Sequence, residues 1–258
     1  MYDYQLHHIV VTWLRYAGDI IKKSFEREIW IDTKESDRDL VTEMDRFLEK
    51  DLVQRIRSAF PSHRIISEEG FGDQVRDTKG FIWTVDPIDG TMNYVKQREN
   101  FGTMIGLFYN GNPIAGYLYT PMDNKLIYGI VGEGVFINER RLKPLDIAHL
   151  KDGILLTSNQ FLLRNDLNLQ AVHDVAFSSR ATGASILKFM QVIEGKAATY
   201  VMPKLSVWDF AAGWAICEAL GMKCTQADGS PLSLLKECSL VVGNPTVYHE
   251  VLEIINQK

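Results

Sequence analysis

The chain has 258 residues, of which 46% are hydrophobic and 24% are charged, and its 33 acidic and 28 basic residues give a net charge of −5. This is the composition of an ordinary globular protein with room for a large core. The negative balance argues against a general binder of nucleic acid or of membrane surfaces.

The three cysteines, Cys217, Cys224 and Cys238, have neither a CxxC spacing nor an adjacent pair of histidines. We therefore expect small core residues rather than a zinc site or a disulfide framework. The N-terminus lacks the pattern of a secretory signal, and no apolar run reaches the roughly 18 residues of a membrane span. These features predict a cytoplasmic protein without a membrane partner.

In the first half of the chain, helices are predicted to precede strands. Apolar positions at helical spacing indicate helices over residues 4–28 and 40–60, and the polar segment 32–39 between them is predicted to be a mobile loop. Runs of alternating or apolar residues, separated by turn signals such as Asn110-Gly111, indicate strands. The predicted strands cover residues 63–67, 80–85, 101–109, 112–119, 125–131 and 132–138.

In the second half, strands and helices alternate. Strands are predicted at 153–157, before Arg180, at 197–202 and at 240–243, and helices at 165–177, 185–194, 209–220 and 245–256. The chain contains no repeat, low-complexity segment or flexible linker. We expect one α/β unit over residues 1–258, with an N-terminal α+β lobe (about 1–150) and a C-terminal α/β lobe (about 151–258).

The hexapeptide Asp86-Pro87-Ile88-Asp89-Gly90-Thr91 directly follows the apolar run 80–85. It should lie at the carboxyl end of a strand, where ligands bind in open α/β sheets. Carboxylates and backbone carbonyls suit Mg²⁺ or Ca²⁺, and the Ile88 carbonyl could face such a cation. The alternative is a turn before a helix, with Asp89 as its N-cap. The hexapeptide alone leaves both interpretations open.

Three further acidic positions have ordinary structural explanations when each is taken singly. Glu68-Glu69 follows a predicted strand and could be a solvated turn. Asp209 opens a predicted helix and would be a good N-cap. Asp45 lies in the first turns of a helix, where an acidic side chain favours the helix dipole.

Taken together and in this order, these motifs resemble the inositol monophosphatase family of magnesium-dependent phosphatases. The resemblance runs from about residue 10 to residue 250 and includes Lys34, residues 39–45, Glu68-Glu69, the hexapeptide, Gly183-Ala184-Ser185 and Trp208-Asp209. It implies a layered αβαβα sandwich of the inositol monophosphatase and fructose-1,6-bisphosphatase type. It also implies hydrolysis of a small phosphate monoester with two or three Mg²⁺ ions, sensitivity to Li⁺, and a homodimer.

The resemblance also implies a role for each matching residue. Glu68, Asp86 and the Ile88 carbonyl would hold one metal ion, and Asp86, Asp89 and Asp209 a second. Asp45 and Thr91, with Glu68, would form the catalytic group that orients and activates water. The substrate would contact Ile88, Asp89, Gly90, Thr91, Gly183, Ala184, Ser185 and Asp209. A mobile loop and a weak third metal would involve Lys34, Asp39 and Glu69.

One position departs from the family pattern. Inositol-specific relatives usually carry a glutamate seven residues before the aspartate that matches Asp209, and here that position is Met202. A thioether cannot replace a carboxylate as a strong hydrogen-bond acceptor. We therefore predict weakened or altered inositol preference, with Lys204 or Arg180 as candidate contacts for a second anionic group.

The alternative substrates are NADP, fructose 1,6-bisphosphate and adenosine 3′,5′-bisphosphate. Ser185 stands where alanine is more common, and we expect it to cap a helix. An alternative of another class is a non-catalytic regulatory protein that binds metal or phosphate. No nucleic-acid polymer is expected as a partner.

Overall fold

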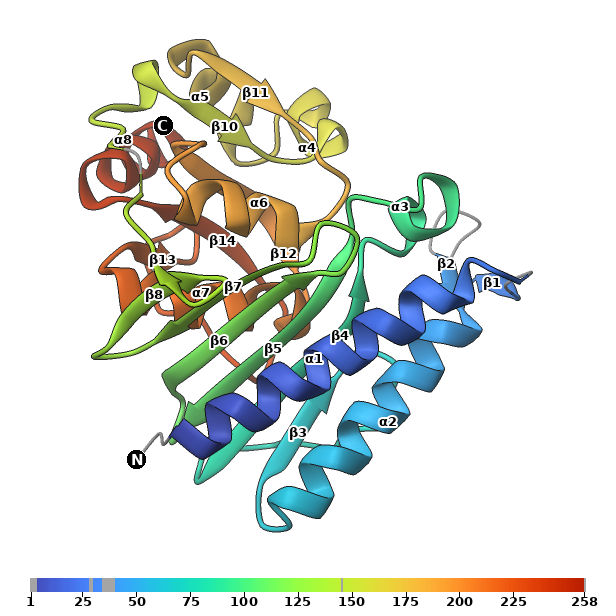
Figure 1. Cartoon of the computed structure of the whole chain (residues 1–258). Helices are drawn as coiled ribbons and strands as arrows, with labels where there is room; N and C mark the ends of the chain where they lie inside the picture. Colours follow the sequence, from blue (N-terminus) through green and yellow to red (C-terminus); the bar gives the residue numbers. More distant parts are fainter. Residues whose placement is uncertain (1–3, 28–29, 34–39, 145, 258) are drawn as a thin grey trace.

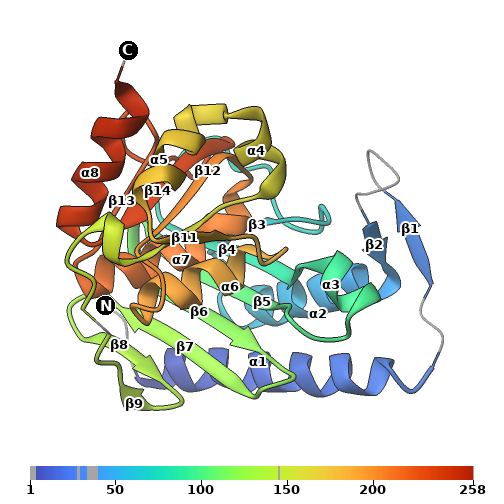
Figure 2. The same ribbon diagram turned by 90° about the horizontal axis from the view of Figure 1, so that it is seen from above.

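Five layers make up the fold, in the order helix, sheet, helix, sheet, helix (Figures 1 and 2). The structure is a computed structural model that describes residues 4–27, 30–33, 40–144 and 146–257. Helices α1 and α2 cover the outer face of the first sheet, α6 and α7 lie between the two sheets, and α5 and α8 cover the outer face of the second. The predicted αβαβα fold is confirmed.

The first sheet has the strand order β3-β4-β5-β6-β7-β8-β9. Only β3 and β4 pair in parallel, and the remaining neighbours are antiparallel. The strands are β3 (Arg64–Ser67), β4 (Phe81–Asp89), β5 (Gly102–Tyr109), β6 (Asn112–Thr120), β7 (Lys125–Ile130), β8 (Gly134–Ile137) and β9 (Arg140–Arg141).

The second sheet has the strand order β11-β10-β12-β14-β13. Strand β10 is parallel to β11 and β12, whereas β14 is antiparallel to β12 and β13. The strands are β10 (Ile154–Leu156), β11 (Ser178–Arg180), β12 (Thr199–Leu205), β13 (Lys223–Thr225) and β14 (Cys238–Gly243). A separate hairpin joins β1 (Ile31–Thr33) to β2 (Leu40–Thr42).

The helices connect and cover these sheets. None of those in the described part of the chain is long and apolar enough to cross a membrane. They are α1 (Tyr4–Ser24), α2 (Glu43–Ala59), α3 (Thr91–Lys96), α4 (Asn159–Arg164), α5 (Leu169–Val175), α6 (Ser185–Ile193), α7 (Val207–Leu220) and α8 (Pro245–Asn256), with short 3-10 turns at Leu150–Asp152 and Asp166–Asn168.

Several predicted boundaries are wrong. Strand β4 continues through Asp89 instead of ending at residue 85, because the hexapeptide keeps pairing with β5 after an irregularity. Residues 31–33 and 40–42 form a hairpin, so the second helix begins at Glu43 with Thr42 as N-cap. The helix predicted at 165–177 is broken because Asn165, Leu167 and Asn168 have positive φ angles. The predicted mobility of 34–39 lies outside the described residues.

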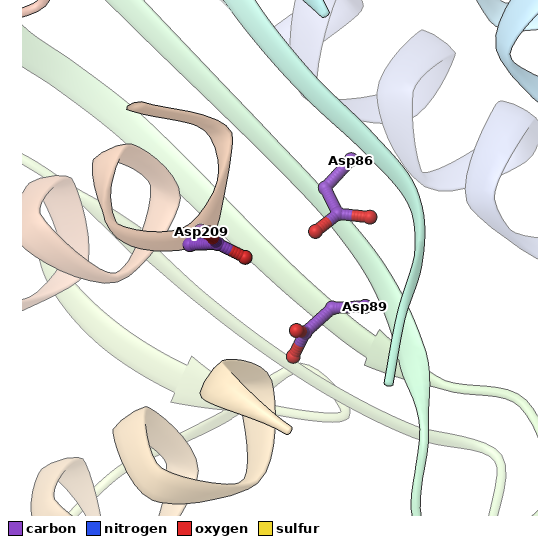
Figure 3. A group of neighbouring side chains, drawn as sticks. All are labelled: Asp86, Asp89 and Asp209. Atoms are coloured by element: carbon purple, nitrogen blue, oxygen red, sulfur yellow. The ribbon is translucent and has the colours of Figure 1, made fainter. Parts of the chain in front are cut away.

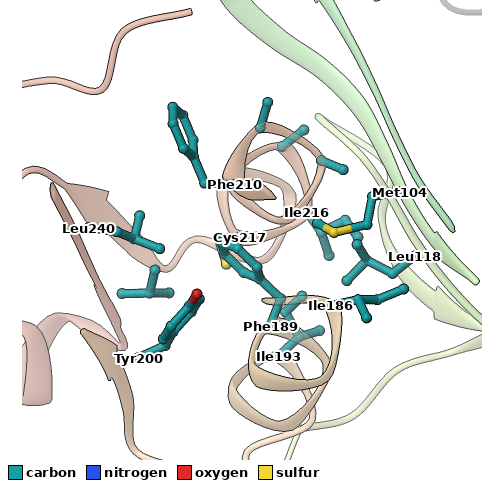
Figure 4. Packing of buried hydrophobic residues seen from close by; sticks show 14 of the residues in the cluster. Met104, Leu118, Ile186, Phe189, Ile193, Tyr200, Phe210, Ile216, Cys217 and Leu240 are labelled. Atoms are coloured by element: carbon teal, nitrogen blue, oxygen red, sulfur yellow. The ribbon is translucent and has the colours of Figure 1, made fainter. Parts of the chain in front are cut away.

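Most of helix α7 is buried, although Glu218 near its end is exposed, and this burial explains its largely apolar sequence. It packs between the two sheets beside α6, with Phe210, Ile216 and Cys217 in the central core (Figure 4). On the first sheet, glycines leave room for its backbone. A Cβ atom at Gly116 would lie 2.1 Å from the Ala212 carbonyl oxygen.

Gly116→Ala is therefore expected to lower the free energy of unfolding by about 2–3 kcal/mol, because the added methyl group meets backbone that cannot rotate away. Urea denaturation measures this loss. Gly229→Ala is the comparison, since its nearest neighbour would be 3.7 Å away and only its positive φ, +81°, opposes the change. Equal losses in the two variants would mean that α7 does not need the close approach.

Candidate active site

Three aspartates gather where the carboxyl end of β4 meets the N-terminus of α7. One carboxylate oxygen from each of Asp86, Asp89 and Asp209 lies within 4.8 Å of the other two. Figure 3 shows all three side chains turned toward a common space. We call this group the aspartate cluster.

The irregularity in β4 explains how one strand supplies two members of the cluster. Side chains alternate between the faces of a regular strand, so residues three apart would point to opposite sides. The pairing of β4 with β5 shifts register between Asp86 and Asp89, which is the signature of a bulge. Asp86 and Asp89 can therefore face the same space although both belong to β4.

The cluster is electrostatically costly without a cation. Burial raises the pKa of Asp86 well above its usual range, and the charges of Glu68, Asp89 and Asp209 raise it further. Burial and the charges of Asp89 and Glu68 likewise raise the pKa of Asp209. Asp86 Oδ1 is buried without a hydrogen-bond partner among the described residues. Buried carboxylates with an unused oxygen are a donor set that suits a hard divalent cation.

Glu68 lies beside the cluster rather than within it. Strand β3 runs parallel to β4 with Ser67 opposite Val85, so the chain delivers Glu68 next to Asp86. Its charge contributes to the raised pKa values of Asp86 and Asp209. The structure therefore brings the four predicted acidic metal ligands into one region, and three of them each have a carboxylate oxygen within 4.8 Å of the others.

A residue that the sequence analysis missed, Glu49 on α2, holds the Glu68-Glu69 loop. Its side chain is fully buried and accepts hydrogen bonds from Ser67 Oγ at 2.7 Å, from Glu69 N at 2.5 Å and from Phe71 N at 2.9 Å. The available signal was an acidic residue beside Leu48 and Leu52 on the apolar face of a predicted helix. Such a buried carboxylate needs partners.

Glu49→Ala should lower the free energy of unfolding by about 3 kcal/mol, because three donors lose their acceptor. Chemical denaturation with and without Mg²⁺ measures the effect. The matched control is Glu253→Ala, which removes an exposed glutamate from α8 and should change stability by less than about 0.5 kcal/mol. A loss at Glu49 no larger than the loss at Glu253 would contradict this role.

The predicted water-activating pair is in contact. Thr91 Oγ1 donates to Asp45 Oδ1 at 3.0 Å and is 3.1 Å from the Ile88 carbonyl oxygen. Asp45 also accepts from the backbone N–H of Thr42 at 2.7 Å, in the capping box that starts α2. Burial raises the pKa of Asp45 to about 6, and these hydrogen bonds oppose the shift.

Gly90 lies where two predicted substrate-binding segments, residues 88–91 and residues 183–185, meet. It has φ = +89°, and a Cβ atom there would lie 2.8 Å from the Cβ atom of Ala184. Asn93 ties the same two segments, since its side-chain amide donates to the Asn100 carbonyl at 2.7 Å and to the Thr182 carbonyl at 3.0 Å. Gly183 follows Thr182, so both segments border the cluster at one place.

The predicted capping roles are wrong. Gly90 is the N-cap of α3, whereas Asp89 accepts a hydrogen bond from Ile186 N at the start of α6. Asp209 is the third residue of α7, where it accepts from the backbone N–H of the N-cap Ser206 at 3.2 Å. Ser185 is the first residue of α6, and its Oγ pairs with Tyr200 OH at 3.1 Å.

The predicted specificity residues differ in their surroundings. Met202 is 8% exposed and packs in the central core, on the same face of β12 as Tyr200. Lys204 forms an ion pair with Glu237 at 2.6 Å. The exposed Arg180 donates to Ser178 Oγ at 2.6 Å. Of the residues predicted to support a third metal ion, Lys34 and Asp39 lie outside the described residues. The backbone N–H of Glu69 donates a hydrogen bond to the Glu49 carboxylate.

The three cysteines are free, and Cys217 and Cys238 are buried as predicted, whereas Cys224 is partly exposed.

Comparisons with known proteins agree over nearly the whole chain. The model of the inositol monophosphatase family matches residues 4–257. The chain is 34% identical over 253 residues to an inositol-1-monophosphatase of Bacillus subtilis (strain 168), with 96% of each chain covered. It is also 32% identical over 260 residues to a Nus factor SuhB of Pasteurella multocida (strain Pm70), covering 96% of this chain and 94% of that one. A solved structure of an IMPase/NADP phosphatase with NADP and Ca²⁺ superposes with a TM-score of 0.91 at 30% identity, covering 98% of this chain and 96% of that one.

Proposed function

Because the chain belongs to the inositol monophosphatase family and is a phosphomonoesterase, we propose that it hydrolyses small phosphate monoesters in a Mg²⁺-dependent reaction at the aspartate cluster. The observation that carries this proposal is the group of three converging carboxylates, whose pKa values are all raised, those of Asp86 and Asp209 well above the usual range. A phosphate monoester carries almost two negative charges at neutral pH, so these carboxylates alone would repel it.

The residues present would hold two or three Mg²⁺ ions per subunit. Glu68, Asp86 and the Ile88 carbonyl would bind one, Asp86, Asp89 and Asp209 a second, and Glu69 and the segment with Lys34 and Asp39 would support a weak third. Bound Mg²⁺ would supply the positive charge that phosphate requires and would lower the pKa of the attacking water.

The chain's own groups would orient that water and move its proton. Thr91 Oγ1 already donates to Asp45 Oδ1, so the hydroxyl oxygen can accept a hydrogen bond from water while Asp45 fixes its direction. Asp45 is acceptor-only when ionised, which the reaction requires. The backbone amides of Gly90 and Thr91, together with Gly183, Ala184 and Ser185, would line the phosphate and its leaving group.

A substrate panel tests the proposal. Release of inorganic phosphate from inositol 1-phosphate, NADP, fructose 1,6-bisphosphate and adenosine 3′,5′-bisphosphate should require Mg²⁺ and should be inhibited by Li⁺. Met202 leads us to expect weak discrimination in favour of inositol 1-phosphate. Absence of turnover on all four substrates would reject the proposal. Size-exclusion chromatography would test the homodimer that the family resemblance implies.

A non-catalytic regulatory role is the second candidate, because several relatives are named Nus factors. A binding protein has no need of a water-orienting pair, and the Thr91–Asp45 contact therefore favours the enzyme. Tight binding of a phosphate monoester without release of phosphate in the presence of Mg²⁺ would favour the regulatory role instead.

A further inference from the structure

A buried lysine on α6 contacts the start of that helix, where Asp89 of the aspartate cluster also binds, and the sequence analysis gave this lysine no role. Lys188 is on α6, in the layer between the two sheets, and is only 5% exposed. Its Nζ atom donates to the Ala184 carbonyl oxygen at 3.3 Å and lies 5.3 Å from the centre of the Tyr200 ring. The side chain therefore turns back toward the start of α6, where Asp89 accepts a hydrogen bond from Ile186 N.

The charges around Lys188 are those of the cluster. Burial lowers the pKa of Lys188, and the two charges that oppose this shift are those of Asp89 and Asp209. Lys188 in turn counteracts the raised pKa values of both aspartates. Within the described residues, no carboxylate oxygen lies within 4.0 Å of Lys188 Nζ. The ammonium group thus acts on the two carboxylates through space rather than as the partner of one ion pair.

Burying a lysine is costly unless negative charge compensates it. The aspartate cluster supplies that charge, and the ring of Tyr200 adds a cation–π contact. A protonated ammonium group has no lone pair and cannot bind a metal ion. Its charge instead repels any cation held by Asp89 and Asp209, with a strength that low local dielectric increases.

We propose that Lys188 is a built-in counter-cation, which offsets one negative charge of the metal-free cluster and weakens the binding of Mg²⁺ at Asp89 and Asp209. This inference rests on the proposed function, because it takes the cluster to be the metal site. Its consequence is a metal position that fills and empties as the Mg²⁺ concentration changes, while the acidic site remains folded without metal.

Calorimetric titration of the substrate-free, full-length protein with Mg²⁺ tests the proposal without any measurement of catalysis. Lys188→Met removes the charge and keeps most of the length of the side chain. At pH 7 it should tighten Mg²⁺ binding by about tenfold or more, because the positive charge of Lys188 no longer repels the bound cation. The increase in melting temperature on adding Mg²⁺ should grow in parallel.

Two variants serve as controls. Lys188→Arg retains the charge and should bind Mg²⁺ as the parent protein does. Lys125→Met removes a lysine that pairs with Glu194 beyond the opposite end of α6, and it should leave the affinity unchanged. Unchanged or weaker binding in Lys188→Met would overturn the proposal. If that variant does not fold, Lys188→Gln carries the same expectation, and equal tightening in Lys125→Met would show only an effect of net charge.

The outcomes separate this inference from the proposed function. Absence of Mg²⁺ binding in the parent protein and in all variants would reject the metal site itself. Mg²⁺ binding that Lys188→Met does not tighten would reject only the role of Lys188. Phosphate release enters neither comparison.

Discussion

Asp86→Asn is expected to reduce Mg²⁺-dependent phosphate release by at least about a thousandfold while it raises the stability of the metal-free protein. Asp86 is 1% exposed, it faces Glu68, Asp89 and Asp209, and its Oδ1 lacks a partner among the described residues. A neutral amide relieves the repulsion but is a poorer ligand than a carboxylate for a divalent cation. The same change should therefore improve folding and remove function.

Two measurements check this expectation. Phosphate release under saturating Mg²⁺ should fall to background, and the melting temperature in a chelator should rise above that of the parent protein. Adding Mg²⁺ should then stabilise the variant much less than it stabilises the parent. Asp174→Asn, at an exposed position of α5, is the control and should change neither quantity. Retained turnover in Asp86→Asn would remove Asp86 from the metal site.

Without metal, the protein is expected to be less stable at pH 8 than at pH 5. The pKa of Asp45 is about 6 in the folded protein, against 3.8 when unperturbed. A carboxyl group whose pKa is raised by folding stabilises the protein fully at low pH, and this contribution is lost as pH rises through the folded pKa. For Asp45 the whole loss, from pH values below 3.8 to values above 7, amounts to about 3 kcal/mol, and about 1.4 kcal/mol of it falls between pH 5 and pH 8. Asp86 and Asp209 act in the same direction.

Urea denaturation in a chelator at the two pH values measures this loss. Burial lowers the pKa of His63, which opposes the trend below about pH 6.5. Asp45→Asn provides the matched comparison, since it removes one carboxyl group and leaves His63 in place. The variant should lose less stability than the parent between pH 5 and pH 8, and Mg²⁺ should reduce the loss in the parent. An identical loss in parent and variant would contradict the assignment to Asp45.

The sequence was most informative where local chemistry decides the structure. Helix α8 begins at Pro245, as proline at the first turn predicts, and its N-cap Asn244 accepts a hydrogen bond from Val247 N. The hairpin turn at Asn110-Gly111 also lies where the sequence places it, because both residues adopt the positive φ angles that such turns need.

Boundaries failed where distant contacts override local preference. Strand β4 continues through Pro87 and Asp89 because β5 lies alongside and Thr103 Oγ1 donates to the Pro87 carbonyl at 2.8 Å. The bulge that turns Asp86 and Asp89 to one side depends on that pairing, so no property of the hexapeptide alone reveals it. Asp209 suits an N-cap by residue type, yet Ser206 takes that position.

Site residues that belong to sequence motifs were predicted, whereas site residues defined by tertiary contacts were missed. The order of the motifs predicted five site residues that the fold brings into one region: Asp45, Asp86, Asp89, Thr91 and Asp209. Glu49 and Lys188 were missed because their surroundings are tertiary: Glu49 meets a loop about 20 residues later, and Lys188 faces aspartates from β4 and α7. Charged residues on the apolar faces of predicted helices were the only available signal for either one.

The placement of α7 makes the site a property of the completed chain. Asp86 and Asp89 are synthesised more than a hundred residues before Asp209, and α7 is held between two sheets, one built from residues 64–141 and the other from residues 154–243. A nascent or truncated chain that ends before α7 has two of the three aspartates and no helix to carry the third. We therefore expect Mg²⁺ binding at the aspartate cluster only after both sheets have closed on α7.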